Sequence, residues 1–583
     1  MIKTLAKSIR QYKKASILSP VFMVMEILME VSIPFFMAYM IDYGINAEGG
    51  VNMEYVTQMS IVLLVCAFLS LFFGSMSGSY ASVSSAGFAA NLRHDIFRKI
   101  QSFSFANTDK FSASSLVTRL TTDVTNVQNT FQMLVRQAVR APIMMIMALI
   151  MSFNVNAQIS LIFLAIIPFL GFGLFFIIMN VHPIFVRAFK TYDKLNNIVQ
   201  ENLHGIRVVK SYVREEVEEG KFNDISSDIY KDFTKAQKRV SFNAPLMQLC
   251  INTCMILVSW IGANLIVGGS MTTGELMSIF AYIMQILMSL MLLSMVFVMI
   301  IISRASAERI VEVLSEESSL QNPADPVMAV SNGSIEFENV GFSYFGDSGE
   351  LCLRDVNISI ASGETIGIIG GTGSAKTSLV QLIPRLYDAT GGAVLIGGID
   401  VRSYDIETLR NAVSMVLQKN LLFSGTIKEN LRWGDEHATD EEIARVCRLA
   451  QADGFIETFP NGYDTYIEQG GTNVSGGQKQ RLCIARALLK KPKILILDDS
   501  TSAVDTRTDA LIRKVFKDEL PHTTKLIIAQ RVSSVQDADR IIVLDAGMVN
   551  AVGTHQELLA GNKIYQEVYS LQQQGGGDFD VEE

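Results

Sequence analysis

The sequence contains few charged residues and little cysteine, histidine or tryptophan. Only 18% of its 583 residues are Asp, Glu, Lys or Arg, whereas 49% are hydrophobic; ordinary soluble domains carry about 25% charged residues. The six cysteines have no paired spacing, which excludes a disulfide framework and a zinc ribbon. The net charge of −9 argues against nucleic-acid binding, so we expect no nucleic-acid partner. A chain this apolar is neither disordered nor an average cytosolic enzyme.

Long runs without a charged side chain predict a membrane domain embedded in the lipid bilayer. These runs cover 55–92, 141–186, 240–274 and 276–303, and each exceeds the roughly 20 residues that a spanning helix needs. A polar turn at 154–158 divides the second run into two helices, and an earlier run is apolar except for Glu26 and Glu30. We therefore predict six membrane helices, at 15–41, 56–84, 134–153, 158–180, 245–268 and 275–303.

The distribution of basic residues predicts the orientation of these helices. Lys and Arg concentrate at the N-terminus and in 93–140 and 187–239, whereas the loops at 42–54, 154–158 and 268–275 contain none. Since basic segments stay on the cytoplasmic side, we expect a multi-pass protein of the plasma (inner) membrane with both termini in the cytoplasm. The two basic inner segments have a helical pattern and predict arms that reach roughly 30–38 Å from the bilayer.

The remainder of the chain changes character after the last apolar run. Residues 316–334 are polar and contain Pro323 and Pro326, which predicts a linker. Beyond them, short β-branched runs alternate with amphipathic helices, as in an α/β domain. The predicted organisation is a membrane domain at 1–315, a linker at 316–334, an α/β domain at 335–572 and an acidic disordered tail at 573–583.

A loop between a buried strand and a helix predicts the nucleotide site. Backbone N–H groups of such a loop cradle phosphates; Lys376 would reach the β- and γ-phosphates and Thr377 would bind Mg²⁺. Ala375 stands where the strict pattern G-x-x-x-x-G-K-[ST] has its second glycine. The residues of this predicted phosphate loop are Gly370, Gly371, Thr372, Gly373, Ser374, Ala375, Lys376, Thr377 and Ser378.

Two further motifs follow in the sequence. An apolar strand at 494–497 ends in Asp498, which suits a carboxylate that holds Mg²⁺, and the pentapeptide at 474–478 reads Val-Ser-Gly-Gly-Gln. Here the chain resembles the ATP-binding cassette (ABC) family, whose signature motif this pentapeptide is similar to. Six spanning helices before one cassette resemble a half-transporter of the exporter type, an α-helical transmembrane domain fused to an α/β P-loop domain.

The resemblance implies roles for further residues and an assembly. Tyr344 matches the aromatic residue that stacks on adenine, Gln418 the glutamine that joins Mg²⁺ to the membrane interface, and Asp505 lies in the D-loop. In this family two cassettes enclose two ATP molecules head to tail, and each ATP site uses the signature of the other cassette. Ser475, Gly477 and Gln478 would therefore act on the ATP of a partner.

Two departures from the family pattern concern hydrolysis. The family has Glu where this chain has Asp499, and a switch histidine where it has Gln530. A carboxylate withdrawn by about 1 Å can lose roughly 100-fold in rate, and an amide cannot exchange a proton as imidazole does. Taken singly, each change also fits tolerated drift from the family pattern. Asp499 and Gln530 together, with Ala375, predict an ATP site that binds but hydrolyses poorly. The expected partner is a second half-transporter with the consensus Glu and His.

The membrane half offers candidate substrate-pathway residues. Met277, Met284, Met288, Met291, Met295 and Met299 share one side of the sixth predicted helix, which suits either helix or lipid packing or an adaptable substrate surface. Glu26 and Glu30 are one turn apart, as are Arg136 and Arg140. They predict either a Glu–Arg clamp or recognition of a cationic substrate.

The function predicted from the sequence is a subunit of an ATP-driven, multidrug-type efflux transporter. It would use ATP and Mg²⁺ and export small hydrophobic or amphipathic compounds as a heterodimer. The alternatives are a membrane-bound ATP-binding regulator or gated pore without substrate turnover, or a lipid or peptide exporter. The motifs do not distinguish among drugs, lipids and peptides as substrates.

Overall fold

The computed structural model describes the chain except residues 48–49, 345, 347–348 and 576–583, and it leaves the side chains at 182, 186, 189, 193, 302 and 574 undescribed. It divides into two compact units. The first comprises Met1–Gln101 and Ser112–Glu316, and the second Ser102–Phe111 and Glu317–Glu583. Of the predicted acidic tail, 576–583 lies outside the described residues.

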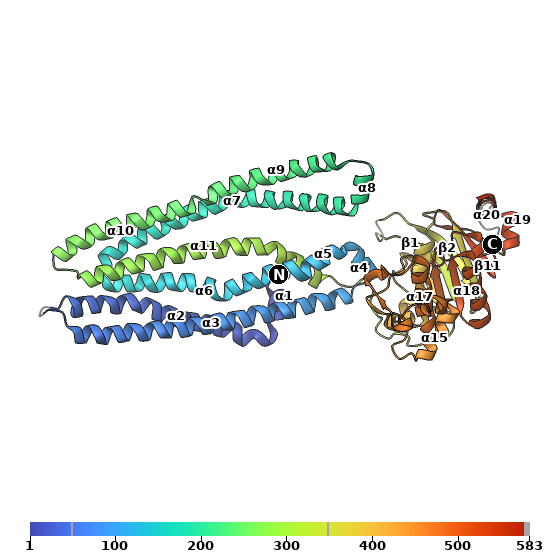
Figure 1. Cartoon of the computed structure of the whole chain (residues 1–583), viewed down its shortest axis with the longest axis horizontal. Helices are drawn as coiled ribbons and strands as arrows, with labels where there is room; N and C mark the ends of the chain where they lie inside the picture. The colour runs from blue at the N-terminus through green and yellow to red at the C-terminus, as the bar shows by residue number, and fades with distance from the viewer. Residues whose placement is uncertain (48–49, 345, 347–348, 576–583) are drawn as a thin grey trace. The chain divides into compact units, whose positions relative to one another are not determined.

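The first unit is built from long helices (Figure 1). Its described part contains six helical segments long and apolar enough to cross a membrane, as predicted. The helices extend beyond the predicted apolar runs because they continue into the arms: α3 has 49 residues and α7 has 48. The α-helices are α1 (Ile2–Ala6), α2 (Lys13–Tyr39), α3 (Met53–Gln101), α5 (Ala113–Thr118), α6 (Val124–Val155), α7 (Ala157–His204), α8 (Ile206–Ser211), α9 (Glu215–Val240), α10 (Asn243–Val267) and α11 (Thr273–Ser315).

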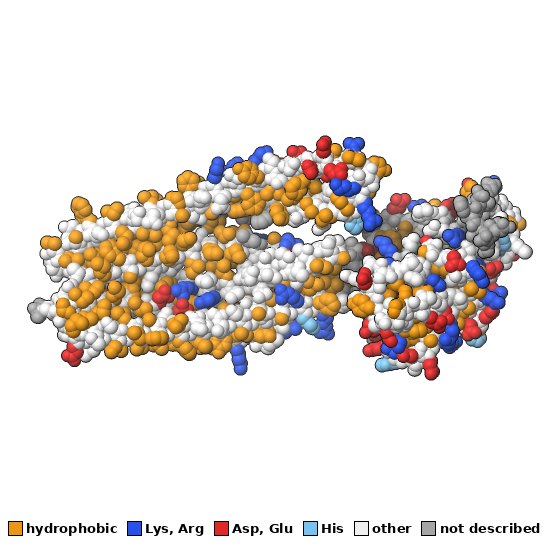
Figure 2. Space-filling view, viewed as in Figure 1, with side chains coloured by type: hydrophobic (Ala, Val, Ile, Leu, Met, Phe, Trp, Pro, Cys, Tyr) orange, Lys and Arg blue, Asp and Glu red, His pale blue; other side chains and the backbone are white. Residues whose placement is uncertain are grey.

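Two groups of helices can be followed in Figure 1. Helices α2, α3, α6 and α11 pack along one another, and α7 lies beside α9 and α10. Apolar side chains of α2 and α11 meet in the interior, where the buried Tyr282 hydroxyl donates a 3.1 Å hydrogen bond to the carbonyl of Val31. Hydrophobic side chains also cover much of the outer surface of these helices in Figure 2, as a lipid environment requires.

The predicted polar turn at 154–158 separates α6 from α7. Asn156 is the N-cap of α7, and its side chain accepts hydrogen bonds from the N–H groups of Gln158 and Ile159 at 3.1 and 3.2 Å. This side chain satisfies backbone donors that the first turn of a helix leaves free. The polar cap Asn156 therefore divides the 46-residue uncharged run at 141–186 into two helices.

The second unit is an α/β cassette built on a six-stranded sheet of order β12-β11-β3-β10-β9-β6. Strands β11, β3, β10, β9 and β6 are parallel, and β12 is antiparallel at the edge. A four-stranded antiparallel sheet has the order β2-β1-β4-β5, and β7 pairs with β8. The strands are β1 (Ile335–Phe342), β2 (Leu353–Ile360), β3 (Thr365–Gly370), β4 (Gly391–Ile396), β5 (Ile399–Asp400), β6 (Val413–Val416), β7 (Gly425–Thr426), β8 (Tyr466–Ile467), β9 (Ile494–Asp498), β10 (Thr524–Ile528), β11 (Arg540–Asp545) and β12 (Met548–Gly553).

Both faces of the six-stranded sheet are buried. Along β9, Leu495 and Leu497 belong to one apolar cluster, whereas Ile494 and Ile496 belong to the other. This alternation follows from the two-residue period of a strand. The helices of this unit are α4 (Phe105–Lys110), α12 (Lys376–Gln381), α13 (Ile406–Ala412), α14 (Ile427–Leu431), α15 (Asp440–Leu449), α16 (Asp453–Ile456), α17 (Gly476–Leu489), α18 (Thr506–Glu519), α19 (His555–Gly561) and α20 (Lys563–Gly575).

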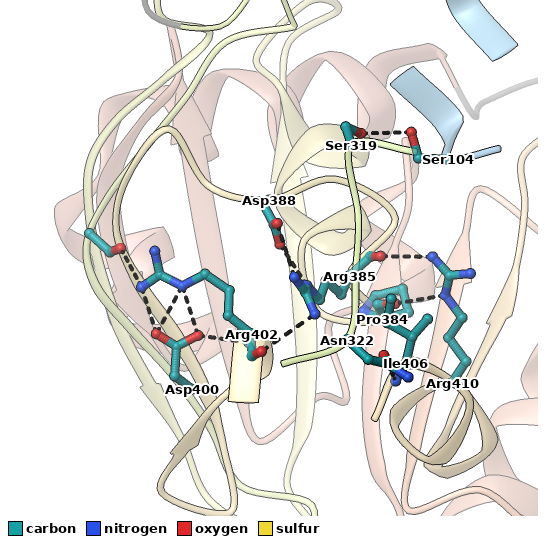
Figure 3. Close-up of polar contacts among 11 residues, drawn as sticks. Ser104, Ser319, Asn322, Pro384, Arg385, Asp388, Asp400, Arg402, Ile406 and Arg410 are labelled. Atoms are coloured by element: carbon teal, nitrogen blue, oxygen red, sulfur yellow. Dashed lines mark hydrogen bonds and ion pairs between the residues drawn. The ribbon is translucent and has the colours of Figure 1, made fainter. Parts of the chain in front are cut away.

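The short helix α4 belongs to the cassette unit although α3 and α5 flank it in the sequence. Its N-cap Ser104 hydrogen-bonds Ser319 at 2.7 Å (Figure 3). The Tyr387 hydroxyl donates to Asp109 at 2.6 Å, and Phe105 packs edge-on against the Tyr387 ring. Sequence patterns alone place this segment in an arm of the membrane domain.

The predicted linker is attached to the cassette. Asn322 accepts a 3.0 Å hydrogen bond from the N–H of Ile406 and donates one to Asp405 at 2.6 Å. In the same part of the unit, the Arg410 guanidinium donates to the carbonyl of Arg385 at 2.9 Å (Figure 3). These bonds give the extended segment after α11 a fixed course within its unit.

Candidate functional site

The predicted nucleotide motifs meet at one edge of the parallel sheet. The phosphate loop follows β3, Gln530 follows β10, Asp498 ends β9 with Asp499 directly after it, and Gln418 follows β6. These four strands are adjacent, in the order β3-β10-β9-β6. Because the carboxyl ends of parallel strands open on the same edge, the fold gathers residues that lie up to about 160 positions apart in the sequence.

The phosphate loop is folded tightly around its lysine. A side chain at Gly370 would lie 2.2 Å from the carbonyl oxygen of Leu544, so only glycine fits there. The Lys376 ammonium donates to the carbonyls of Gly370 and Gly371 at 3.0 and 2.8 Å. Burial lowers the pKa of Lys376, and the negative charges of Asp498 and Asp499 oppose this decrease. Thr372 and Gly373 form the tip of the loop, where Gly373 has φ +82°.

Ala375 has a left-handed backbone conformation, with φ 67° and ψ 26°. An L-residue in this region carries a strain of about 1–2 kcal/mol that glycine avoids. The departure from the glycine pattern therefore places a strained residue at the N-cap of α12. The sequence identifies the missing glycine but not this strain, because the backbone angles depend on the folded loop.

The residues present fit a magnesium ion. The Thr377 hydroxyl donates to Asp498 at 3.1 Å, and the other carboxylate oxygen of Asp498 is buried without a hydrogen-bond partner among the described residues. Asp498 is only 2% exposed, and burial raises its pKa. A hydroxyl and a carboxylate oxygen are ligands that Mg²⁺ takes together with phosphate oxygens. The described residues contain no cluster of three or more His, Cys, Asp or Glu side chains for a metal.

Asp499 and Gln530, the two departures from the family pattern, are in direct contact. The Gln530 side-chain amide donates a 2.9 Å hydrogen bond to Asp499. Burial raises the pKa of Asp499, and hydrogen bonds from Gln418 and Gln530 lower it. The carboxylate that would face an attacking water therefore accepts a hydrogen bond from the neutral amide of Gln530.

Gln572 near the end of α20 holds the segment that contains Gln530. Its side chain donates to the carbonyl of Gln530 at 2.7 Å and accepts from the N–H of Val532 at 2.8 Å. The sequence gives no signal for this contact, because Gln572 begins a run of three glutamines beside the acidic tail. The contact extends the candidate site to the last described helix.

The signature motif begins α17 and faces outward. Ser475 and Gln478 form a capping box: the Ser475 hydroxyl accepts from the N–H of Gln478, and the Gln478 side chain accepts from the N–H of Ser475. Ser475 is exposed, and a side chain at Gly477 would lie 2.8 Å from the carbonyl of Ala503. Among the described residues, no hydrogen bond joins this motif to the phosphate loop of the same chain.

Gln480, which the sequence motifs do not include, joins the signature helix to the D-loop. Its side-chain oxygen accepts from the N–H of Ala503 at 3.0 Å, and its amide donates to Ser502 at 3.2 Å. Asp505 caps α18 by accepting from the N–H of Thr508 at 2.9 Å, and this bond lowers the pKa of Asp505. The D-loop is therefore fixed at both ends.

Tyr344 lies beside the phosphate loop. Its hydroxyl is 2.9 Å from that of Ser378, and its ring is 45% exposed. The ring packs at a right angle against Tyr387, with centroids 5.2 Å apart. A half-exposed aromatic face next to a phosphate loop suits stacking of a flat base.

The candidate pathway residues lie in the first unit. Met277, Met284, Met288, Met291 and Met295 are each at least 44% exposed, so they do not form the core of this chain. Arg140 pairs with Glu26 at 2.5 Å and with Glu30 at 2.6 Å. The predicted Glu–Arg clamp is therefore present, and its arginine is Arg140 rather than Arg136.

A phosphate loop at the edge of a parallel sheet, in a chain with six candidate membrane spans, defines a nucleotide-binding membrane protein. The family model for the ABC transporter transmembrane region matches residues 16–316, and the model for ABC transporter matches residues 353–502. The chain therefore belongs to the ABC transporter family, as an exporter half-transporter.

Known proteins resemble the chain over most of its length. The uncharacterized ABC transporter ATP-binding protein YfiB of Bacillus subtilis is 36% identical over 564 residues, which is 97% of each chain. The fatty acid ABC transporter ATP-binding/permease protein of Mycobacterium tuberculosis is 33% identical over 477 residues, which is 82% of this chain and 75% of that protein. A bacterial Atm1-family ABC exporter with ATP bound has the same fold: the TM-score is 0.85 at 23% identity, over 96% of this chain and 99% of that one.

Proposed function

We propose that this chain is the hydrolysis-impaired subunit of a heterodimeric ATP-driven exporter. The observation that carries the proposal is the contact between Asp499 and Gln530 at 2.9 Å. Both residues stand where ABC proteins that hydrolyse ATP have a glutamate and a histidine. The binding groups Lys376, Thr377 and Asp498 are all present beside them.

The residues of this site would bind ATP and turn it over slowly. Loop N–H groups and Lys376 bind phosphates, Tyr344 stacks on the base, and Thr377, Asp498 and Gln418 hold Mg²⁺. When bound, Mg²⁺ neutralises charge that develops on the phosphates.

Hydrolysis needs a group that orients a water molecule against the γ-phosphate. The Asp499 side chain is shorter than that of glutamate and is hydrogen-bonded to Gln530. The amide of Gln530 cannot accept the proton of the attacking water. This site would therefore keep its ATP for long periods.

The signature motif supports a second half-transporter as the partner. Ser475 is exposed at the start of α17 and has no hydrogen bond to the phosphate loop of its own chain within the described residues. A helix N-terminus with free N–H groups favours an anion. Ser475, Gly477 and Gln478 would thus complete the hydrolysing ATP site of a partner with the consensus glutamate and histidine.

Amphipathic compounds are the proposed cargo. The exposed methionines of α11 form an adaptable apolar surface. A relative named as a fatty acid transporter agrees with an amphiphile. We further propose that both termini lie in the cytoplasm of the plasma (inner) membrane, because the basic residues cluster in the N-terminus and in the segments 93–140 and 187–239.

The test compares the full-length chain alone with its complex with a co-expressed consensus half-transporter. We expect substrate-stimulated ATPase activity only in the complex. Trapped radiolabelled ATP should remain longer at the Lys376 site than at the partner's site. Equal turnover at both sites, or equal ATPase activity of the chain alone, would contradict the proposal. A complex that binds ATP but shows no substrate stimulation would favour a regulator or pore.

A further inference from the structure

A polar groove lies within the apolar part of the first unit. It has a volume of about 800 Å³, and its lining combines Glu26 of α2 and Arg136 of α6 with one side of α3. That side of α3 is formed mainly by small residues, although it belongs to the uncharged run 55–92. The small residues are Ser70, Gly74, Ser75, Gly78, Ser79 and Ser82.

The charges around the groove are incompletely paired. Arg140 uses its guanidinium on one oxygen of Glu26 and one oxygen of Glu30. The second oxygen of Glu26 is buried and has no hydrogen-bond partner among the residues that the structure describes, and Glu26 as a whole is only 9% exposed. Arg136 forms no ion pair with any side chain that the structure describes. Within the described part of the chain, the groove therefore contains one acceptor oxygen without a hydrogen bond and one guanidinium without an ion pair.

Both groups face glycines of α3. A side chain at Gly74 would lie 3.1 Å from the unpaired Glu26 oxygen, and one at Gly78 would lie 3.4 Å from the Arg136 guanidinium. Four residues of helix span about 6 Å. The unpaired carboxylate oxygen and the guanidinium thus lie roughly one helical turn apart, and the two glycines let both groups approach the backbone of α3 closely.

Charged groups that are only partly paired are costly within a membrane. Such residues face a bundle interior or a water-filled cavity and mark ligand pathways. Figure 2 shows acidic and basic side chains on the surface in the middle of the apolar region. Arg136 is half-buried, and the Glu26 side chain is 11% exposed. A ligand that matches the groove therefore carries an anionic group for Arg136 and a hydrogen-bond donor for Glu26, about one helical turn apart.

We propose that this groove binds the zwitterionic headgroup of an amphiphile. Its phosphate or carboxylate would bind Arg136, its ammonium would donate to Glu26, and the serine hydroxyls of α3 would bind the remaining polar atoms. The apolar tail would lie along the neighbouring exposed side chains, such as Leu71 and Val83. This assignment names the cargo class and rests on the proposed export function.

The test measures binding to the full-length chain in a neutral maltoside detergent. The probes are radiolabelled lysophosphatidylethanolamine, lysophosphatidic acid, which lacks the ammonium, and an alkylamine, which lacks the phosphate. We expect the zwitterion to bind at least about tenfold more tightly than either, ~1.4 kcal/mol. Glu26→Gln and Arg136→Gln should each remove this advantage. Gly78→Val, which keeps both charges and fills the groove, should weaken all binding.

Glu30→Gln is the matched control, because Glu30 pairs with Arg140 but does not line the groove. It should bind the zwitterion like the unaltered chain. The proposal would be overturned if Arg136→Gln and Glu26→Gln bound the zwitterion with wild-type affinity. It would also be overturned if the unaltered chain bound lysophosphatidic acid as tightly as the zwitterion. Zwitterion binding that is unchanged by Gly78→Val would contradict it as well. Binding is measured without the partner, so failure of the heterodimer proposal, seen as equal turnover at both ATP sites, is a separate result.

Discussion

The side-chain amide of Gln572 donates a 2.7 Å hydrogen bond to the backbone carbonyl of Gln530. With the second bond, from the N–H of Val532, it holds both ends of a three-residue segment. The side chain of Gln530 in turn contacts Asp499. A residue of the last described helix therefore helps to set where the hydrolysis residues lie.

Replacement of this amide should loosen the switch segment. Gln572→Ala removes two hydrogen bonds, which are worth about 1 kcal/mol each. We expect faster hydrogen exchange at the N–H of Val532 and altered ATP retention at the Lys376 site. Gln573→Ala is the matched control, because Gln573 donates only to Tyr569 among the described contacts. Unchanged exchange at Val532 would contradict this role.

Ala375→Gly should stabilise the cassette and tighten ATP binding. Glycine avoids the left-handed strain of about 1–2 kcal/mol but loses more conformational entropy on folding, about 0.5–1 kcal/mol. The expected net gain is of order 0.5–1 kcal/mol in the free energy of unfolding. Ala510→Gly in the exposed face of α18 should have the opposite sign, by about 1 kcal/mol. Thermal unfolding of both variants decides whether the strain is real.

Restoring the family residues should restore hydrolysis only in combination. Asp499→Glu lengthens the carboxylate, and Gln530→His replaces the amide that holds it. Either change alone should do little, because residues that act as a unit are strongly non-additive. The double variant should raise turnover about tenfold or more, ~1.4 kcal/mol of barrier. ATPase activity is measured in a complex whose partner lacks its own glutamate; no rise with intact ATP binding would place the defect elsewhere.

Ser475→Ala should stop hydrolysis in the complex although Ser475 lies about 100 residues from Lys376. It also removes a helix cap, which costs about 1 kcal/mol. Thr439→Ala removes an equivalent capping box from α15 and controls for that loss. Gly477→Asp is a poorer test, since its side chain would meet the Ala503 carbonyl at 2.8 Å. If Lys376→Ala reduced ATPase activity more than Ser475→Ala, the Lys376 site would be the hydrolysing one, and the proposed assignment of the two ATP sites would be reversed.

Removal of the Asp498 charge should have opposite effects on the stability of the nucleotide-free protein and on Mg²⁺-dependent ATP binding. Burial raises its pKa above 3.8, so the folded state binds the proton more tightly than the unfolded state. Its contribution to stability is therefore lost as pH rises through the interval between 3.8 and the raised pKa. Asp498→Asn should raise the unfolding temperature of the nucleotide-free protein at neutral pH and abolish Mg²⁺-dependent ATP binding. A lower unfolding temperature would contradict this account.

Sequence patterns predict the six spans and the nucleotide motifs because both depend on local composition and spacing. The apolar runs and the Asn156 cap determine the membrane helices, and strand–loop–helix order brings Lys376 to Asp498. Tertiary contacts are not encoded in this way. Nothing in the sequence selects Arg140 over Arg136 as the partner of Glu26, because both stand one turn apart on the same helix. The site roles assigned from motifs remain predictions.

The membership of Ser102–Phe111 in the cassette unit bears on biosynthesis. The ribosome completes these residues about 200 positions before it reaches Glu317. At 5–20 residues per second, α4 waits roughly 10–40 s for the first residue of the remainder of its unit. A separately translated C-terminal module would therefore lack one helix of the cassette unit. A fragment that starts at Glu317 would leave the Tyr387 hydroxyl without Asp109 and expose the ring surface that Phe105 covers in the full-length chain.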